Sequence, residues 1–354
     1  MKRMDAVAPL QRGYDLPSSI VEEGTYPVVY SNGILCTHKE FKCEAPAVIT
    51  GRSGTIGKFT YLDKGYYWPH NTTLWVTDFY NNDPKFIYYL YHTINIAQFA
   101  TGSGVPTLNR NDVHRHRCYL PLNVIEQKKI AKLLSLLDER IATQSRAIER
   151  LETLIKGINQ NAFTENGVSY KLEEICEIRS GYSGNQISIN KGLKVSRIET
   201  ISDHKINMER IGYVEPFNTS DNYRLQIGDI LFSNINSVQY IGNTAFVDKD
   251  YDLYHGMNLL RLIPNKKVIP FYLYLLLNTS KMLNGFKAIC NKAVSQASIN
   301  QTQLGKIIIT LPGIERQKRI CDIYKTLYSK LETEENCLYL LQKQKQYLLR
   351  QMFI

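Results

Sequence analysis

The sequence predicts an α+β protein: two mixed α/β domains in a pseudo-two-fold repeat, separated by two long helices that form an antiparallel coiled coil. The chain has 354 residues, which suits two or three domains rather than one. A long segment occurs twice, at 120–163 and at 311–353, and both copies space their apolar residues in heptads. We therefore expect a first domain at 1–120, a first helix at 121–164, a second domain at 165–311 and a second helix at 312–354.

The repeat extends from the helices into the globular domains. Gln127 and Gln317 are 190 positions apart, and so are Phe163 and Phe353. Further upstream, residues 56–57 correspond to 241–242 at an offset of 185, and residues 3–14 correspond to 171–182 at an offset of 168. Because the offset grows along the chain, we infer that the second copy carries insertions in its variable part.

Each globular domain contains short β-rich runs separated by Gly, Asn and Asp turns, which is typical of strands. A tyrosine-rich helical stretch follows, and then a loop that leads back to a strand. In the first domain we expect strands at 47–50, 58–62 and 73–76, a helix at 84–99 and a loop at 102–111. In the second domain we expect strands at 229–233, 243–247 and 259–263, a helix at 270–286 and a loop at 292–300.

Each long helix has one apolar seam with alternating steps of three and four residues, as in a coiled coil. Two amphipathic helices that pack separately on their own domains are the alternative, but matching lengths and matching seams favour mutual packing. The first seam consists of Ile130, Leu134, Leu137, Ile141, Gln144, Ile148 and Leu151, and continues to Ile158. The second seam consists of Ile320, Tyr324, Leu327, Leu331, Glu334, Leu338 and Leu341, and continues through Lys345 to Leu348.

The polar seam residues predict the register of the helix pair. Gln144 lies near the midpoint of the first helix, and Glu334 occupies the same heptad position 190 residues later. If the helices run antiparallel about a pseudo-two-fold axis, equivalent midpoints must meet. We therefore expect Gln144 and Glu334 to face each other and to fix the register, at some cost in stability.

The chain is basic, with a formal net charge of +10 and a pI near 9.1. Such a charge suits a polyanionic partner because Lys and Arg displace counterions from phosphate, although many basic proteins never bind DNA. The sequence has neither an apolar run long enough to span a membrane nor a signal peptide, so we expect a cytoplasmic protein. The seven cysteines form no CxxC pair, so we expect reduced packing residues rather than metal ligands.

Sequence signatures of common catalytic centres are missing. The chain has no Pro-Pro, which the Asp/Asn-Pro-Pro-aromatic motif of adenine methyltransferases requires, and it has neither HExxH nor Gly-x-Ser-x-Gly. The nearest match to a phosphate-binding loop, residues 51–59, is one residue too long and places Phe59 where a magnesium ligand is needed. We therefore expect no catalytic residue, cofactor or metal in this chain, although a nuclease built from scattered carboxylates would leave no such signature.

Several short motifs occur in the order of the repeat. LQRGYDLP (10–17), YPVVYSNG (26–33), ITGRSGTIGKFTYLD (49–63), NTTLWV (71–76) and GSGVPTLNRNDV (102–113) mark the first domain, and GDILFS (228–233) and IGNTAFV (241–247) mark the second. The first helix begins with P-x5-Q-x2-I-A, from Pro121 to Ala131. With these motifs the chain resembles the specificity subunits of type I restriction–modification systems (HsdS-like) over essentially its whole length. The second copy departs from the pattern, because Pro312 stands one residue closer to its glutamine.

The resemblance implies a division of labour. Each globular domain would be a target-recognition domain that reads one half of a split, asymmetric double-stranded DNA sequence, and the helices would set the distance between the halves. Two methyltransferase (modification) subunits, which bind S-adenosylmethionine and methylate adenine, would dock on this scaffold. Restriction subunits would add ATP-driven translocation and cleavage. The chain itself would be a non-catalytic subunit without a cofactor of its own.

Candidate DNA-contacting residues are amide, basic, hydroxyl and tyrosine side chains near turns, because Asn and Gln suit adenine and Arg suits guanine. Glycines beside Arg52 allow a close approach of the backbone, but a tight hairpin with a solvated arginine explains them equally well. Residues 232–240 also fit a self-capping turn, and the basic run 114–117 fits a phosphate contact or a solvated strand end better than base readout. The candidates are Gln11, Arg12, Tyr14, Arg52, Ser53, Lys58, Asn109 and Arg110 in the first domain, and Arg179, Tyr182, Asn185, Lys194, Arg197, Ser233, Asn234, Asn236, Gln239 and Gln301 in the second.

Two other classes of protein compete with this interpretation. A coiled-coil interaction scaffold without DNA readout would explain the helices, but it explains the repeated globular domains less well. A self-contained nuclease or methyltransferase is disfavoured by the missing methyl-transfer motif. We therefore expect the chain alone neither to methylate nor to cleave DNA, and not to bind S-adenosylmethionine.

Overall fold

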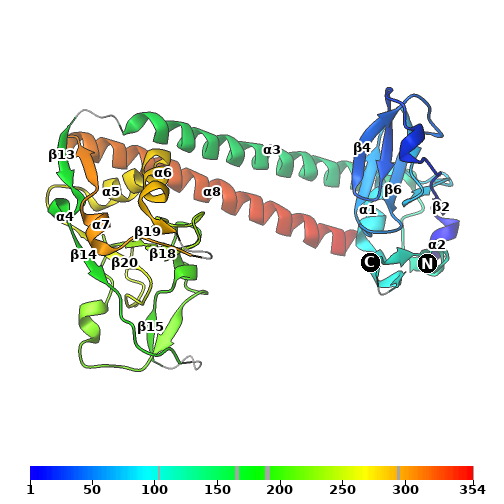
Figure 1. Cartoon of the computed structure of the whole chain (residues 1–354). Coiled ribbons are helices and arrows are strands. Elements are labelled where there is room, and N and C mark those ends of the chain that lie inside the picture. The colour runs from blue at the N-terminus through cyan, green and yellow to red at the C-terminus, as the bar shows by residue number, and fades with distance from the viewer. Residues whose placement is uncertain (103, 164–166, 188–191, 293–295, 354) are drawn as a thin grey trace. The chain divides into compact units, whose positions relative to one another are not determined.

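The computed structural model of the chain describes residues 1–102, 104–163, 167–187, 192–292 and 296–353. The chain forms two compact units, one made of Met1–Ala147 together with Glu334–Ile354, and one made of Ile148–Thr333. Each unit combines a globular domain with a part of both long helices (Figure 1). Each long helix is therefore divided between the two units, one after Ala147 and the other after Thr333.

The globular domain of the first unit contains two four-stranded sheets. One has the order β2–β9–β6–β7 with antiparallel pairs, and the other has the order β4–β3–β8–β5 with β3 and β8 parallel. The central strand β6 is buried at every residue. The bounds are β2 Leu10–Arg12, β3 Tyr26–Tyr30, β4 Gly33–His38, β5 Cys43–Glu44, β6 Ala47–Gly51, β7 Phe59–Leu62, β8 Tyr66–Pro69 and β9 Thr73–Val76; β1 (Lys2–Arg3) pairs with β12 (Arg117–Cys118), and β10 (Ala100–Thr101) with β11 (Thr107–Leu108).

Helix α1 (Pro84–Thr93) packs on the first sheet of this domain. It begins where the Asp83 side chain accepts a hydrogen bond from the Phe86 N–H, with proline in the first turn. The helix is shorter than the expected 84–99, because the β-branched Thr93 and Ile94 are followed by Asn95, and all three disfavour a helix interior. A 3-10 helix at Ile96–Phe99 follows, and α2 (Arg110–Arg115) leads to β12.

The second unit repeats this plan with a sheet of order β14–β20–β17–β19, all antiparallel. The expected helix at 270–286 is two helices, α5 and α6, because the Thr279 side chain accepts a hydrogen bond from the Met282 N–H and starts a second helix. The bounds are β13 Val168–Lys171, α4 Leu172–Ile175, β14 Cys176–Ser180, β15 Leu193–Val195, β16 Gly212–Val214, β17 Ile230–Phe232, β18 Ile235–Asn236, β19 Thr244–Phe246, β20 Leu260–Pro264, α5 Pro270–Leu277, α6 Ser280–Ile289, β21 Asn291–Lys292, β22 Ala297–Ser298, α7 Gln301–Gly305 and β23 Ile308–Leu311.

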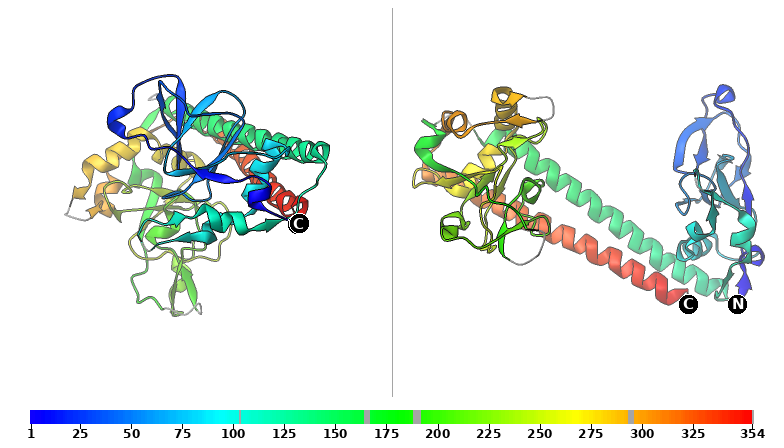
Figure 2. Two further views of the ribbon diagram at one scale, coloured as in Figure 1. Left: turned by 90° about the vertical axis from the view of Figure 1, so that its right-hand side faces the viewer. Right: turned by 60° about the horizontal axis from the view of Figure 1, so that its bottom comes forward.

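The long helices α3 (Val124–Ala162) and α8 (Ile314–Met352) have 39 residues each and run antiparallel in both units (Figures 1 and 2). In the first unit Lys345 forms an ion pair with Asp138, and in the second the Tyr324 hydroxyl donates a hydrogen bond to Asn159. Every residue of the two predicted seams is buried or half-buried. The helices therefore pack on each other along the seams, as a coiled coil requires.

Gln144 and Glu334 meet within the first unit. The Gln144 amide donates to the Glu334 carboxylate, and also to the Glu334 backbone oxygen at 3.0 Å. Each is the twenty-first residue of its 39-residue helix, one residue past the midpoint, so the middles of the two helices face each other. This is the contact that the antiparallel register predicts.

A buried glutamine anchors the start of each long helix. The Gln127 side chain is fully buried; its oxygen accepts a hydrogen bond from the Asp83 N–H, and its nitrogen donates to Asn82 and to the Pro121 carbonyl, all at 2.8 Å. Gln317 is 1% exposed and repeats this pattern with the Ile269 N–H and the Pro312 carbonyl. The P-x5-Q motif is therefore structural: it ties the first turn of the long helix to the loop that starts α1 or α5.

The two units differ at the junction where α1, or its counterpart α5, meets the long helices. In the first unit the Lys85 ammonium lies 4.0 Å from the ring centre of Tyr61 and 4.8 Å from that of Tyr88, beside Asp138. Burial of this amine lowers the pKa of Lys85. In the second unit the corresponding residues are all aromatic: Phe246, Phe271, Tyr274 and Tyr328. The first junction is therefore built from charges and rings, and the second from rings alone.

An aromatic pair holds the end of each long helix. At the end of α8, Phe353 stacks on Phe86 of α1 with ring centres 5.0 Å apart. Phe163, just beyond α3, packs on Tyr272 of α5 at 5.3 Å. Each globular domain thus holds the start of one long helix and the end of the other.

Candidate nucleic-acid interface

In the first unit, the loops that follow β2 and β6 are hydrogen-bonded to one turn, His70–Thr73, which joins β8 to β9. The Gly13 N–H donates to the Thr73 oxygen, and the Arg52 N–H donates to the Thr72 oxygen at 2.7 Å. The Leu108 N–H in turn donates to the Arg52 oxygen at 2.7 Å, so the segment before Asn109 joins the same cluster. The structure therefore brings the candidates Arg12, Tyr14, Arg52, Ser53 and Asn109 into one region.

The turn itself is tightly hydrogen-bonded. The Thr73 N–H and hydroxyl both donate to the His70 oxygen, at 2.9 and 2.7 Å. The His70 ring lies 3.0 Å from the Thr72 hydroxyl, and burial lowers the pKa of His70, so its imidazole is neutral at pH 7. A turn fixed in this way can present its side chains with little loss of freedom on binding.

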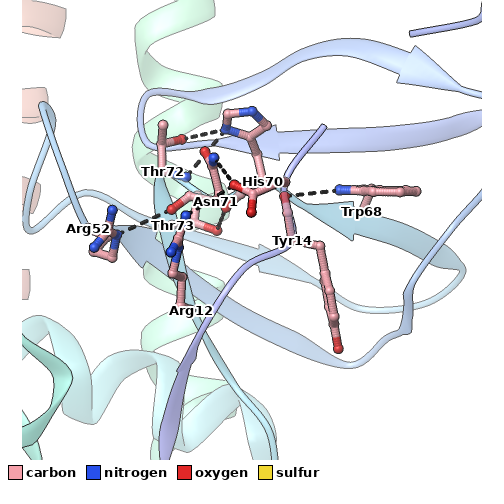
Figure 3. Close-up of polar contacts among 9 residues, drawn as sticks. Arg12, Tyr14, Arg52, Trp68, His70, Asn71, Thr72 and Thr73 are labelled. Atoms are coloured by element: carbon pink, nitrogen blue, oxygen red, sulfur yellow. Dashed lines mark hydrogen bonds and ion pairs between the residues drawn. The ribbon is translucent and has the colours of Figure 1, made fainter. Parts of the chain in front are cut away.

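The side chains of Arg12, Asp15 and Asn71 form hydrogen bonds with one another beside this turn; Figure 3 labels Arg12 and Asn71. The Asp15 carboxylate accepts hydrogen bonds from the Arg12 guanidinium at 3.1 Å and from the Asn71 amide. The Arg52 guanidinium donates to the Asn71 backbone oxygen at 3.2 Å. Asp15 and Asn71 are absent from the sequence-based candidates. The sequence signal for Asn71 was its position at the start of the NTTLWV motif, directly after a histidine, whereas Asp15 lies within LQRGYDLP.

The other first-unit candidates have varied surroundings. The Lys58 ammonium donates to the Asn32 oxygen at 2.8 Å in the turn between β3 and β4. Asn109 caps α2 by accepting a hydrogen bond from the Asn111 N–H, which leaves Arg110 exposed in the first turn. Gln11 is exposed on β2, whereas the Tyr14 ring points away from the cluster and packs with apolar residues (Figure 3).

The basic run 114–117 is not one patch. The His114 imidazole accepts a hydrogen bond from the Leu10 N–H, and burial lowers the pKa of His114, so this ring is neutral and structural. Arg115 forms an ion pair with Asp112. Arg117 lies in β12, opposite Arg3. This arrangement agrees with a solvated strand end more than with base readout.

In the second unit, the candidate cations are paired with carboxylates at the surface. Arg179 contacts Glu177 at 2.7 Å, Lys194 contacts Asp252 at 3.5 Å, and Arg197 contacts Glu199 at 3.7 Å; each of these side chains is more than one-third exposed. Exposed pairs of this kind contribute only about 0–1 kcal/mol. The cations can therefore exchange their carboxylates for phosphates at little cost.

Aromatic rings order the loops around Tyr182. Its ring stacks on Phe217 with centres 3.9 Å apart and an interplanar angle of 7°, and Tyr223 meets both rings edge-on. Asn185 and Gln239 are exposed on separate loops. The Tyr182 ring therefore has a packing role, and the exposed amides of Asn185 and Gln239 remain candidates for contacts with a ligand.

The segment after β17 corrects one assignment. Ser233 is completely buried, and its hydroxyl accepts a hydrogen bond from Asn236, so Ser233 is placed to position Asn236 rather than to touch DNA. The Asn234 backbone oxygen accepts the Ile299 N–H. Gln301 donates to the Ile178 oxygen and ties α7 to β14. Asn234 and Asn236 are both half-buried, and Gln301 is exposed, whereas the side-chain oxygen of Asn234 is buried.

Other kinds of chemistry find little support in the described residues. Among them, no group of three His, Cys, Asp or Glu side chains could hold a metal ion, and no helix is long and apolar enough to cross a membrane. All seven cysteines are free, and burial raises the pKa of the Cys43 thiol to about 11 and that of Cys176 to about 12. These two thiols are therefore protonated and unreactive at neutral pH.

Comparison with known proteins identifies the chain. The family described as the type I restriction modification DNA specificity domain matches residues 1–153 and 165–341. The chain belongs to this family. Each match begins with one globular domain and runs into the long helix that follows it, so the specificity-domain family accounts for both halves of the repeat.

Curated relatives match part of the chain. It is 45% identical over 188 residues to the protein named as the type I restriction enzyme MjaX specificity subunit of Methanocaldococcus jannaschii, covering 52% of this chain and 44% of that protein. It is 25% identical over 277 residues to the type I restriction enzyme MjaVIII specificity subunit of the same organism, covering 69% and 64%. The chain thus spans less than two thirds of the length of both relatives.

Solved structures share the fold over nearly the whole chain. The S subunit of a type I restriction–modification system from M. genitalium has a TM-score of 0.67 at 18% identity and covers 100% of this chain and 95% of its own. A chain from a study of complex assembly and conformational transition of the type I R-M system has a TM-score of 0.60 at 17% identity, with coverage of 99% and 96%. At such low identity the likeness establishes the fold.

Proposed function

We propose that this chain is the DNA-sequence specificity subunit of a type I restriction–modification enzyme, in which each globular domain reads one half of a bipartite, asymmetric duplex target. The observation that carries the proposal is one fold, present twice, with two different sets of loop side chains. The first unit has Arg52 and Lys58 bonded to backbone oxygens, and the second has cations paired with exposed carboxylates. Two such surfaces on a chain of net charge +10 suit two different stretches of DNA.

The helices α3 and α8 serve in this proposal as the spacer and as the docking site for methyltransferase subunits. Leu133 is 44% exposed and Ile323 is 52% exposed, and both lie outside the seams at positions 190 residues apart. Leu136, 47% exposed, lies one turn beyond Leu133. Equivalent apolar positions on both helices suit two copies of the same partner.

The chain takes no catalytic part in this proposal. The methyltransferase subunits bind S-adenosylmethionine and transfer the methyl group to adenine, and restriction subunits are a further partner. A coiled-coil scaffold without DNA readout is the second candidate function. The hydrogen-bonded, basic loop cluster of the first unit favours DNA binding over that alternative.

The test is methylome sequencing of cells that carry this chain together with its methyltransferase partner. We expect adenine methylation at one split, asymmetric sequence, and binding of the purified complex to that duplex that weakens steeply as salt rises. Equal affinity for every duplex at physiological salt would refute sequence readout. The rigorously purified single chain should show neither methyl transfer nor DNA cleavage.

A further inference from the structure

The hydrogen bonds that hold the Asn71 side chain are not needed for this domain fold, because the second domain has the same fold without them. In the second unit Tyr182 bridges to Gly256 as Tyr14 bridges to His70 in the first, so Met257 takes the place of Asn71. By the same register Ser180 takes the place of Arg12, and the serine at 183 takes the place of Asp15. The second domain therefore folds without this polar trio.

The trio instead fixes the hydrogen-bonding pattern that Asn71 presents. The Asp15 carboxylate accepts one of the two amide hydrogens, which defines the side of the amide that carries nitrogen. The second amide hydrogen and the amide oxygen remain available; within the described residues the side-chain oxygen Oδ1 of Asn71 accepts no hydrogen bond, whereas its backbone oxygen accepts one from Arg52. Asp15 is itself held by Arg12, and the side chains of Asp15 and Arg12 are 69% and 50% exposed.

We propose that Asn71 reads one adenine of the DNA half-site bound by the first domain, and that Asp15 is the positioning residue that holds its amide. An asparagine recognises adenine by accepting from N6–H and donating to N7. The amide oxygen and the second amide hydrogen supply this pair. Arg12 and Arg52 flank the amide and supply positive charge for the neighbouring phosphates.

This proposal rests on the proposed function but goes beyond it. The two domains share a fold, so side chains that differ between equivalent surface positions are where different sequences can be read. Arg12, Asp15 and Asn71 differ from their counterparts at all three positions. The rigid turn His70–Thr73 holds Asn71 by main-chain bonds from both sides, which limits the loss of freedom on binding.

The experiment uses the full chain with its methyltransferase partner and compares the wild type with Asn71→Ala and Asp15→Ala. Methylome sequencing of each should show that Asn71→Ala accepts other bases at one adenine of one half-site, whereas the other half-site is unchanged. Binding of the purified complex to duplexes substituted at that position should lose about 5- to 150-fold of its discrimination. Asp15→Ala should relax the same position by a smaller factor.

The matched control is Lys39→Ala, which removes an exposed ion pair with Glu22 in the same domain but leaves the turn untouched. It should keep the wild-type motif. The proposal is overturned if both test variants keep every base preference, or if they weaken binding equally for all sequences. A wild-type complex that methylates no split sequence would instead contradict the proposed function itself. Thermal unfolding of each variant separates loss of readout from loss of the fold.

Discussion

Replacing Gln127 by leucine should destabilise the first unit strongly, because this fully buried side chain joins three segments of the chain. It makes three hydrogen bonds, each of which contributes about 1 kcal/mol net. Leucine would also leave the Asp83 N–H and the Pro121 carbonyl without these partners, at about 1 kcal/mol for each, the low end of the usual cost, because both residues are only half-buried. We expect Gln127→Leu to lower the free energy of unfolding of this unit by about 3–5 kcal/mol.

Urea denaturation followed by tryptophan fluorescence measures this effect in the first unit alone, because both tryptophans, Trp68 and Trp75, lie there. Gln317→Leu removes the equivalent side chain from the second unit and should be seen by circular dichroism. Gln342→Ala on the exposed face of α8 is the control and should stay within about 0.5 kcal/mol. If Gln127→Leu also stayed within that range, the motif would not anchor the helix.

Gln127→Glu refines the test. An ionised glutamate can accept from the Asp83 N–H but cannot donate to the Pro121 carbonyl, whereas a protonated one can do both. The variant should therefore come closer to the wild type in stability as the pH falls below the pKa of the buried carboxyl. A constant difference between pH 5 and pH 8 would show that the donated bonds contribute nothing.

Three further predictions concern the helices, the second core and the first junction. Inserting four residues into each long helix adds about 6 Å, so the gap between half-sites in the methylome should grow by about one or two base pairs; an unchanged gap would show that the helices do not set the spacing. His255 is 1% exposed, and burial lowers its pKa to about 4. The stability that the neutral ring contributes is therefore present above pH 6.5 and is lost as the pH falls towards 4. The reason is that the unfolded chain takes up a proton in this range, whereas the folded chain does not. Over that pH range, the free energy of unfolding of the wild type, measured by urea denaturation, should fall by about 3 kcal/mol more than that of His255→Gln. Equal losses would contradict the lowered pKa of His255. Converting the first junction to the chemistry of the second, with Lys85→Phe and Asp138→Tyr together, should make tryptophan-detected unfolding less dependent on salt than in the wild type.

The fold was largely predictable because its signals are periodic. The heptad spacing of apolar residues such as Leu134 and Leu331 predicts directly which face of each long helix is covered. The register of the helix pair followed from two polar seam residues, Gln144 and Glu334. The helix boundary at Thr279 escaped because the apolar residues before it, up to Leu277, and after it, from Met282, were assigned to one helix across four polar residues, and a capping hydroxyl is a local signal. Short strands such as β10 and β18 also lack enough residues to show alternation.

The candidate interface was predictable by region but not by side chain. Arg12 and Arg52, chosen beside glycines, both lie close to the turn His70–Thr73, yet Ser233 is buried beneath Asn236, and Tyr14 packs inward. Which face of a short strand is exposed depends on neighbours far along the chain. The partnership of Asp15 with Asn71, 56 residues apart, has no periodic signal at all.

The first unit is built from two segments that are far apart in the sequence, and this has a consequence for folding during synthesis. Its globular domain and the first part of α3 leave the ribosome early, but its share of α8 begins only at Glu334, after the 186 residues of the second unit. At about 5–20 residues per second, that interval lasts roughly 10–40 s. Throughout it, Phe86 lacks the ring of Phe353 and Gln144 lacks its carboxylate partner. The second unit, a continuous stretch of chain, can fold within that interval, so the domain translated first is the one completed last.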